Sequence, residues 1–204
     1  MKQVLQTGEL AGMAAADIKH MMDAVGEELK HHQLHEKPPK MGLRIQQLMT
    51  QLTGNADPYK AVKAKSNDIA LQAYPAMKRM VGSAEHPLLT AVQIACAGNI
   101  IDYGTFSVEN LNISKEVERI LEMEQEVIEY ERPEFFAFQE FSDALKDVET
   151  LVYIGDNCGE IVFDRVLIET IAEMYPHIDI TFLTRGEPIL NDCLVEDALQ
   201  CGLE

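Results

Sequence analysis

Oxygen-bearing side chains follow two short apolar segments near the end of the sequence. Asp156 and Asn157 come after the first segment, residues 151–154, and Asp192 lies in the loop after the second, residues 177–183. In an open parallel sheet, ligands bind beyond the carboxyl ends of the strands. Two carboxylates and one carboxamide at neighbouring strand ends suit a hard divalent cation, which prefers oxygen ligands. These residues therefore indicate a candidate metal site.

Groups that suit an anion lie beside these residues. Gly159 and Glu160 open the next predicted helix, and a helix N-terminus offers unpaired backbone amides to an anion. Arg185 follows the second segment, and its guanidinium suits a phosphate. A simpler interpretation stays open, because Asp and Asn after a strand often cap the helix that follows. Asp164, inside that helix, is either a surface charge or a neighbour that supports the site.

The chain that must position these residues changes character near residue 149. Before it, apolar residues recur at three- and four-residue intervals, which is typical of helices. After it, strand-like runs alternate with helical spacing, as in parallel α/β proteins. We therefore predict an α/β protein with a helical part at residues 1–148. Residues 149–204 are then the first half of a Rossmann-like α/β/α sheet.

Several helix boundaries follow from single residues. Apolar groups from Leu10 to Met22 predict one helical face, and Gly54 is expected to stop a helix at 41–52. Asp57-Pro58 and His86-Pro87 each predict a new helix, and we expect Pro75 to kink or end the first of these two.

Two parallel strands do not make a stable sheet, because such sheets need three or more strands with helices on both faces. Three explanations remain open: strands hidden in the helical part, a partner chain that completes the sheet, or a sequence that is a fragment of a longer protein. We favour the fragment.

Composition excludes several classes of protein. The 204 residues carry a formal charge of −17, which disfavours binding to nucleic acid or to an anionic membrane. No apolar run is long enough to predict a transmembrane helix, and the N-terminus has no apolar signal core, so we expect a cytoplasmic protein. The cysteines have no C-x-x-C spacing and are expected to be buried or half-buried thiols.

Four separated segments together resemble one known family. Residues 155–164 read GDNCGEIVFD, residues 185–192 read RGEPILND and residues 97–104 read AGNIIDYG, while Asp57-Pro58-Tyr59 and Lys65-Ser66-Asn67 also fit. These segments resemble, in order, the motifs of the archaeal and bacterial branch of the damage-control phosphatase family. The resemblance covers nearly the whole chain. The family's initial C-x-x-C element and its later lysine-bearing K-G-x-G-N segment are not in this sequence.

The resemblance implies a phosphatase that depends on Mn, Co, Ni or Mg and hydrolyses phosphate esters of small metabolites: sugar phosphates, nucleotides or phosphopantetheine derivatives. It implies that Asp156, Asn157 and Asp192 are the metal ligands and catalytic residues. It places Asn99 and Asp102 in the substrate cleft, with Glu160 and Arg185 as further substrate contacts. The expected partner is therefore a small phosphorylated metabolite, and association with a second copy of the chain stays open. The alternative is a non-catalytic metal- or metabolite-binding polypeptide that acts through a partner chain.

Overall fold

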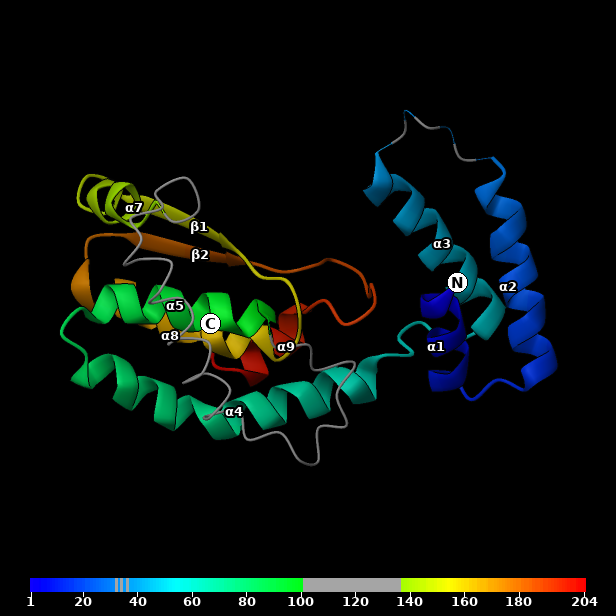
Figure 1. Ribbon diagram of the computed structural model, residues 1–204, viewed down its shortest axis with the longest axis horizontal. Coiled ribbons are helices and arrows are strands. Elements are labelled where there is room, and N and C mark those ends of the chain that lie inside the picture. The colour runs from blue at the N-terminus through cyan, green and yellow to red at the C-terminus, as the bar shows by residue number, and fades with distance from the viewer. Residues whose placement is uncertain (32, 34, 36, 101–136) are drawn as a thin grey trace. The chain divides into compact units, whose positions relative to one another are not determined.

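The computed structural model describes residues 1–31, 33, 35, 37–100 and 137–204. The described chain separates into two compact units, residues 1–61 with 187–191 and residues 62–186 with 192–204. Their elements are the helices α1 (Lys2–Leu10), α2 (Ala15–Leu29), α3 (Pro38–Thr53), α4 (Lys60–Ser83), α5 (Pro87–Ile100), α7 (Phe138–Ala144), α8 (Glu160–Met174) and α9 (Val195–Gln200), and the strands β1 (Thr150–Ile154) and β2 (Asp179–Leu183) (Figure 1). The predicted division into 1–148 and 149–204 stays a prediction.

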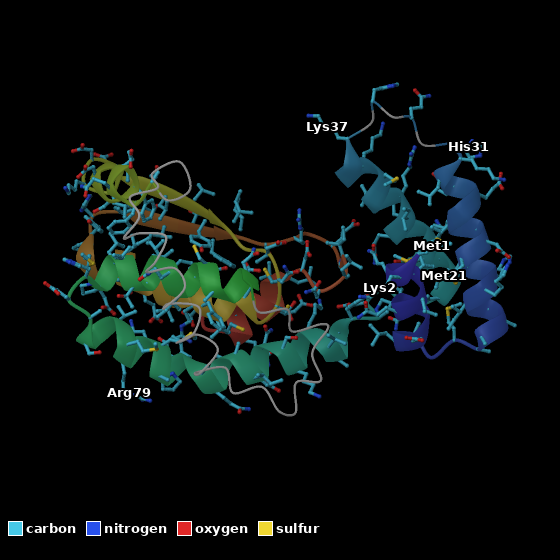
Figure 2. The ribbon with its side chains drawn as sticks, in the orientation of Figure 1. Met1, Lys2, Met21, His31, Lys37 and Arg79 are labelled. Carbon is cyan, nitrogen blue, oxygen red and sulfur yellow. The ribbon has the colours of Figure 1, made fainter. Side chains whose placement is uncertain are left out.

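The first unit is built on α1, α2 and α3. Their apolar faces enclose a small core in which Met21, labelled in Figure 2, is fully buried with Val4, Val25 and Met49. The predicted continuous helical face from Leu10 to Met22 is wrong, because α1 ends at Leu10 and α2 begins only at Ala15. Between them Gly12 has a φ of 70°, a left-handed conformation that turns the chain.

The predicted end of α3 and the predicted start of α4 are confirmed, whereas α4 does not end at Pro75. Gly54 follows α3 with a φ of 63°, which confirms the left-handed stop. The Asp57 carboxylate accepts a hydrogen bond from the Tyr59 amide at 3.2 Å just before α4, as a capping side chain does. Pro75 does not end α4, which continues to Ser83.

The second unit holds a parallel sheet of β1 and β2, in which Leu151 pairs with Ile180 and Tyr153 with Phe182. These four side chains alternate with exposed ones and pack against the main core. That alternation buries one face of the sheet. Helices α8 and α5 make the largest helix contact of the described chain and lie side by side in Figure 1. The predicted α/β class, with a helical first part and parallel strand–helix units after it, is confirmed.

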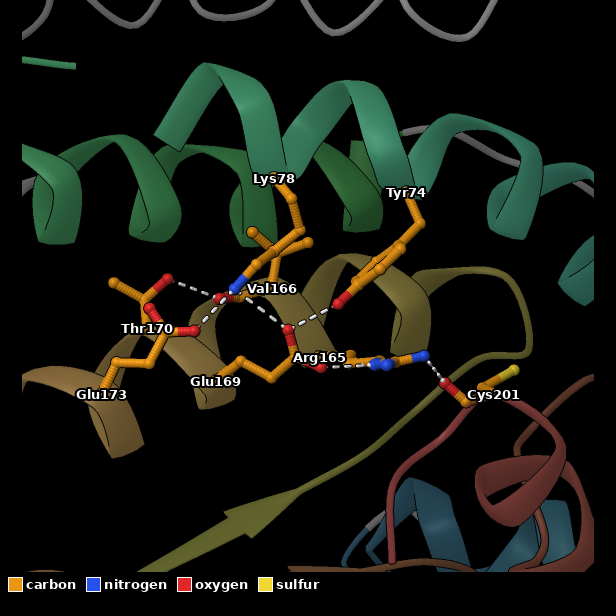
Figure 3. A network of polar contacts seen from close by, with 8 residues as sticks. All are labelled: Tyr74, Lys78, Arg165, Val166, Glu169, Thr170, Glu173 and Cys201. Carbon is orange, nitrogen blue, oxygen red and sulfur yellow. Dashed lines mark hydrogen bonds and ion pairs between the residues drawn. The ribbon is translucent and has the colours of Figure 1, made fainter. Parts of the chain in front are cut away.

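Helix α4 joins this core through an apolar stripe and a polar network. Its buried face carries Ala70, Ala73, Met77 and Val81, at the three- and four-residue spacing of one helical face. On a neighbouring face a network links α4 to α8 and to the end of α9 (Figure 3). In it Glu169 accepts hydrogen bonds from Tyr74 at 2.5 Å and from Arg165 at 2.7 Å, and pairs with Lys78 at 3.1 Å. Arg165 also donates to the Cys201 carbonyl at 2.9 Å.

In the part of the chain that the structure describes, no helix has the length and apolar character needed to cross a membrane.

The contact of α5 with α8 yields a prediction about stability. A Cβ atom at Gly98 would lie 2.8 Å from the Cβ of buried Phe163, so Gly98→Ala overpacks this contact. We expect it to lower the free energy of unfolding by about 1–3 kcal/mol. Urea unfolding followed by circular dichroism measures this. Gly82→Ala, where an added Cβ meets nothing within 4 Å, is the control and is expected to be neutral or stabilising. Equal stability of Gly98→Ala and the parent would contradict the prediction.

Candidate metal and phosphate site

The first loop of the candidate site, residues 155–159, begins where β1 ends. The Gly155 amide donates to the Leu183 carbonyl at 2.9 Å, which extends the parallel pairing one residue beyond the strand. A Cβ at Gly155 would lie 2.3 Å from the Phe182 ring, so a larger residue at this position would have to displace that ring. Asp156 and Asn157 follow at once. The loop ends at Gly159, whose φ of 90° turns the chain into α8.

Backbone contacts tie this first loop to the second loop, residues 184–194, which follows β2. Asn157 and Asp192 form an isolated antiparallel bridge. The Cys193 amide donates to the Asp156 carbonyl at 2.7 Å, and the Arg185 amide donates to the Cys193 carbonyl at 3.1 Å. The side chains at the two strand ends are therefore held together by main chain, as the sequence interpretation requires.

The predicted site side chains form one connected series of polar contacts. Asn99, on α5, donates to a Glu160 oxygen at 3.2 Å, and Asn157 donates to the other Glu160 oxygen at 3.3 Å. The Asn157 amide also donates to Asp156 at 3.3 Å. Because the nitrogen of this amide faces two carboxylates, its Oδ1 is the atom able to bind a cation.

Arg185 links the two candidate carboxylate ligands, Asp156 and Asp192. Its Nε donates to Asp192 at 2.7 Å, and its Nη2 lies 3.9 Å from an Asp156 oxygen. Asp192 is buried, whereas the side chains of Asp156 and Arg185 are about half exposed. The guanidinium of Arg185 thus lies beside both carboxylates, at a position that is accessible to solvent.

The structure therefore brings together six of the seven predicted site residues: Asn99, Asp156, Asn157, Glu160, Arg185 and Asp192. The seventh, Asp102, lies outside the described residues. The roles assigned to all seven stay predictions.

Burial and like charge disfavour the ionised forms of two acids here. Burial, followed by repulsion from Asp156, raises the pKa of Asp192, although Arg185 partly opposes the shift. Burial raises the pKa of Asp164 to about 7, and repulsion from Glu160 and Asp156 adds to it. Tyr153 opposes that shift by donating a 2.6 Å hydrogen bond to Asp164. A cation beside these carboxylates would favour their ionised forms.

The donor chemistry of the site fits a hard divalent cation. Asp156, Asn157 and Asp192 offer only oxygen atoms, which is the ligand set of Mg²⁺ and similar ions. No group of three or more His, Cys, Asp or Glu side chains that could hold a metal is found among the described residues. The candidate set has two carboxylates, and its third member is the carboxamide of Asn157.

The thiols near the site are unsuited to act as nucleophiles. Cys158 and Cys193 are free and buried, as predicted for them. Burial, reinforced by the charge of Asp197, raises the pKa of Cys193 to about 12 and that of Cys158 as well. Both therefore stay protonated at neutral pH, and a thiolate mechanism is disfavoured. Cys96 is exposed, so the prediction of a buried or half-buried thiol is wrong at that position.

Sequence reasoning missed three residues around the site loops, each of which contacts a loop or the helix that follows it. Tyr153 contacts Asp164, Asn67 contacts Gly159, and Lys63 pairs with Asp197 just beyond the second loop. Asn67 was noticed only as part of a family motif. A signal was present in the sequence, since Lys63 and Asn67 continue the helical spacing of the apolar face of α4 with polar residues.

The comparisons with known proteins agree on one family. The family model described as damage-control phosphatase ARMT1-like domain matches residues 1–203. An uncharacterized protein of Methanocaldococcus jannaschii is 36% identical over 163 residues, which is 79% of this chain and 51% of the relative. A damage-control phosphatase of Archaeoglobus fulgidus is 31% identical over 160 residues, 78% of this chain and 51% of the relative.

A solved structure is similar over almost the whole chain. It is a DUF89 family protein from Pyrococcus horikoshii, with a TM-score of 0.81 and 28% identity. The similarity covers 99% of this chain and 67% of that one. The chain spans about half the length of the curated relatives that it matches.

The raised pKa of Asp164 predicts a pH dependence of stability. The folded protein holds a proton on Asp164 up to about pH 7, whereas the unfolded chain releases it near its ordinary value of 3.8. Between these values the folded state binds more protons, so its stability falls as the pH rises, by up to about 1.4 kcal/mol per pH unit. Asp164→Asn should remove this slope. Urea unfolding from pH 4.5 to 7 in EDTA measures it, and parallel curves for the two proteins would contradict the prediction.

Proposed function

This chain belongs to the damage-control phosphatase ARMT1-like domain family, and from that premise we propose that it is a divalent-metal-dependent phosphatase. Its proposed substrates are phosphate esters of small metabolites, such as sugar phosphates, nucleotides or phosphopantetheine derivatives. The observation that carries the proposal is the connected series from Asn99 to Asp192 at the ends of β1 and β2. The cytoplasmic location is proposed with it, on composition alone.

The proposed metal ligands are Asp156, Asn157 and Asp192. A divalent cation held there would supply Lewis-acid polarisation of the phosphate ester. The proposed choice among Mn, Co, Ni and Mg rests on the oxygen-only donor set, which all four accept. Glu160 supports the arrangement, because it accepts from Asn157 and so orients the amide oxygen of that residue.

Arg185 is proposed to bind the phosphate. Its side chain is 54% exposed, and its terminal nitrogens remain able to donate while Nε donates to Asp192. A guanidinium offers paired donors that match phosphate oxygens and stabilises charge that develops on them. Asn99 donates to the Glu160 oxygen that Asn157 does not contact, and it is proposed to contact the part of the substrate beyond the phosphate.

A second candidate function is binding of a metal or metabolite without catalysis, through association with a partner chain. The observation that favours it is length, since the match covers 51% of the first two relatives. The activity of those whole proteins is therefore only a proposal for this chain.

Hydrolysis of p-nitrophenyl phosphate tests the enzyme. With Mn²⁺, Co²⁺, Ni²⁺ or Mg²⁺ present, we expect activity that falls at least about 100-fold in Asp156→Asn and is abolished by EDTA. Asp147→Asn, at an exposed carboxylate before β1, is the matched control and should retain full activity. Background rates with every metal, equal for the parent chain and Asp156→Asn, would refute the proposed enzyme.

Metal binding is testable separately from turnover. Ligand binding to the folded state stabilises it by about 2.7 kcal/mol at 100 times the dissociation constant. We expect Mn²⁺ to raise the melting temperature of the parent chain and of Asp147→Asn, and to leave that of Asp192→Asn nearly unchanged. Differential scanning calorimetry measures these shifts. A shift that survives in Asp192→Asn would remove that residue from the ligand set.

A further inference from the structure

The buried face of α4 changes from apolar to polar at one end. Ala70, Ala73 and Met77 continue, at the same helical spacing, into Asn67 and Lys63. Asn67 is 0% exposed and Lys63 is 2% exposed, so both side chains lie in the interior. A buried amide or ammonium is costly unless it is hydrogen-bonded or paired. The polar end of this face therefore depends on specific partners.

Asn67 contacts the first loop. Its Oδ1 accepts a hydrogen bond from the Gly159 amide at 2.7 Å. Gly159 caps α8, and amides at a helix N-terminus have no partner within their own helix. The acceptor comes from α4 and fixes the turn that follows Asp156 and Asn157. The Nδ2 of Asn67 has no hydrogen-bond partner among the described residues, so the contact with Gly159 is what orients this side chain.

Lys63 contacts the first turn of α9, directly after the second loop. Its Nζ lies 3.3 Å from Asp197 Oδ2, and the side chains of this pair are only 2% and 10% exposed. The same Asp197 oxygen accepts from the Leu194 amide at 2.9 Å. Leu194 directly follows Cys193, which is hydrogen-bonded to both Asp156 and Arg185. Lys63 therefore holds, through Asp197, the segment that carries Asp192.

We propose that Lys63 and Asn67 are positioning residues that hold the two ligand-carrying loops in register. The proposal rests on the proposed function, because it assigns the two residues to the same candidate metal site. They stand four residues apart on α4, which is about one helical turn or 6 Å along the helix axis. Asn67 contacts the first loop directly, and Lys63 acts on the second loop through Asp197, so a rigid turn of α4 sets the spacing between Gly159 and Leu194, and with it the approach of Asp156 to Asp192.

Hydrogen exchange of the metal-free full chain tests the positioning directly. Asn67→Leu keeps the side-chain size but removes the acceptor, and should speed exchange of the Gly159 amide about tenfold or more. Lys63→Met should do the same to the Leu194 amide. The Val166 amide, inside α8, is the internal reference: local loosening leaves it unchanged, whereas general destabilisation speeds its exchange as well. Exchange at Gly159 and Leu194 that only follows Val166 would overturn the proposal.

Calorimetric titration with Mn²⁺ supplies the second measurement. We expect the dissociation constant to rise about tenfold in Asn67→Leu and in Lys63→Met. Tyr74→Phe is the matched control, because it removes a contact between α4 and α8 that lies in the network of Figure 3 and not at the loops. Its Mn²⁺ affinity should equal that of the parent chain. Equal affinity in all four proteins would refute the role toward the metal.

The two proposals fail in distinguishable ways. A parent chain that binds no Mn²⁺ and hydrolyses nothing refutes the proposed function, while selective exchange at Gly159 and Leu194 still supports the positioning by Lys63 and Asn67. A parent chain that binds Mn²⁺, together with variants that exchange and bind like it, refutes the positioning alone.

Discussion

Holding several carboxylates close together in a partly buried place costs free energy, and the structure of the candidate site depends on how that cost is offset. Asp156, Glu160, Asp164 and Asp192 converge where β1 and β2 end, in a chain whose formal charge is already −17. The cost is visible in the pKa values of Asp164 and Asp192, which are raised by burial and by repulsion from neighbouring carboxylates. Arg185 partly offsets this repulsion, and it contacts Asp156 and Asp192 from a half-exposed position. An arrangement of this kind is stabilised by any further cation that reaches it.

Repelling side chains stay together only on a scaffold that resists their separation. Parallel pairing of β1 with β2 sets the strand ends side by side, and the bridge between Asn157 and Asp192 continues that pairing into the loops. The polar end of α4 then contacts the first loop through Asn67, and reaches the second loop through the pair of Lys63 with Asp197. Buried polar contacts of this kind add little net stability, because desolvation offsets them, but they are satisfied in only one arrangement. Their effect here is to specify geometry.

The strands and the residues at their ends were predictable from the sequence because both are local features. The apolar run 151–154 and the residues Asp156 and Asn157 after it lie within one short segment. The break between α1 and α2 was missed because apolar spacing continues across Gly12, although the glycine turns the chain. Of the two outcomes predicted for Pro75, a kink or an end, the end is wrong, since the apolar stripe packs on both sides of Pro75 and α4 continues to Ser83. Local patterns report what a segment prefers, and tertiary packing decides whether the preference is realised.

The contacts made by Asn67 and Lys63 could not be predicted from local patterns at all, because they join residues far apart in the sequence. Asn67 and Gly159 are 92 residues apart, and Lys63 and Asp197 are 134 apart, so no periodicity links them. The spacing of α4 shows only that polar residues occupy core positions, and the fold alone identifies their partners. All of these residues, with every described member of the candidate site, belong to the compact unit of residues 62–186 and 192–204. The six described residues of the candidate site thus lie within one unit, whereas the matched stretch is 51% of each of the first two relatives. The proposed metal binding therefore needs only residues of this unit, whereas the proposed turnover is inferred from the longer relatives, and the two proposals are separable by experiment.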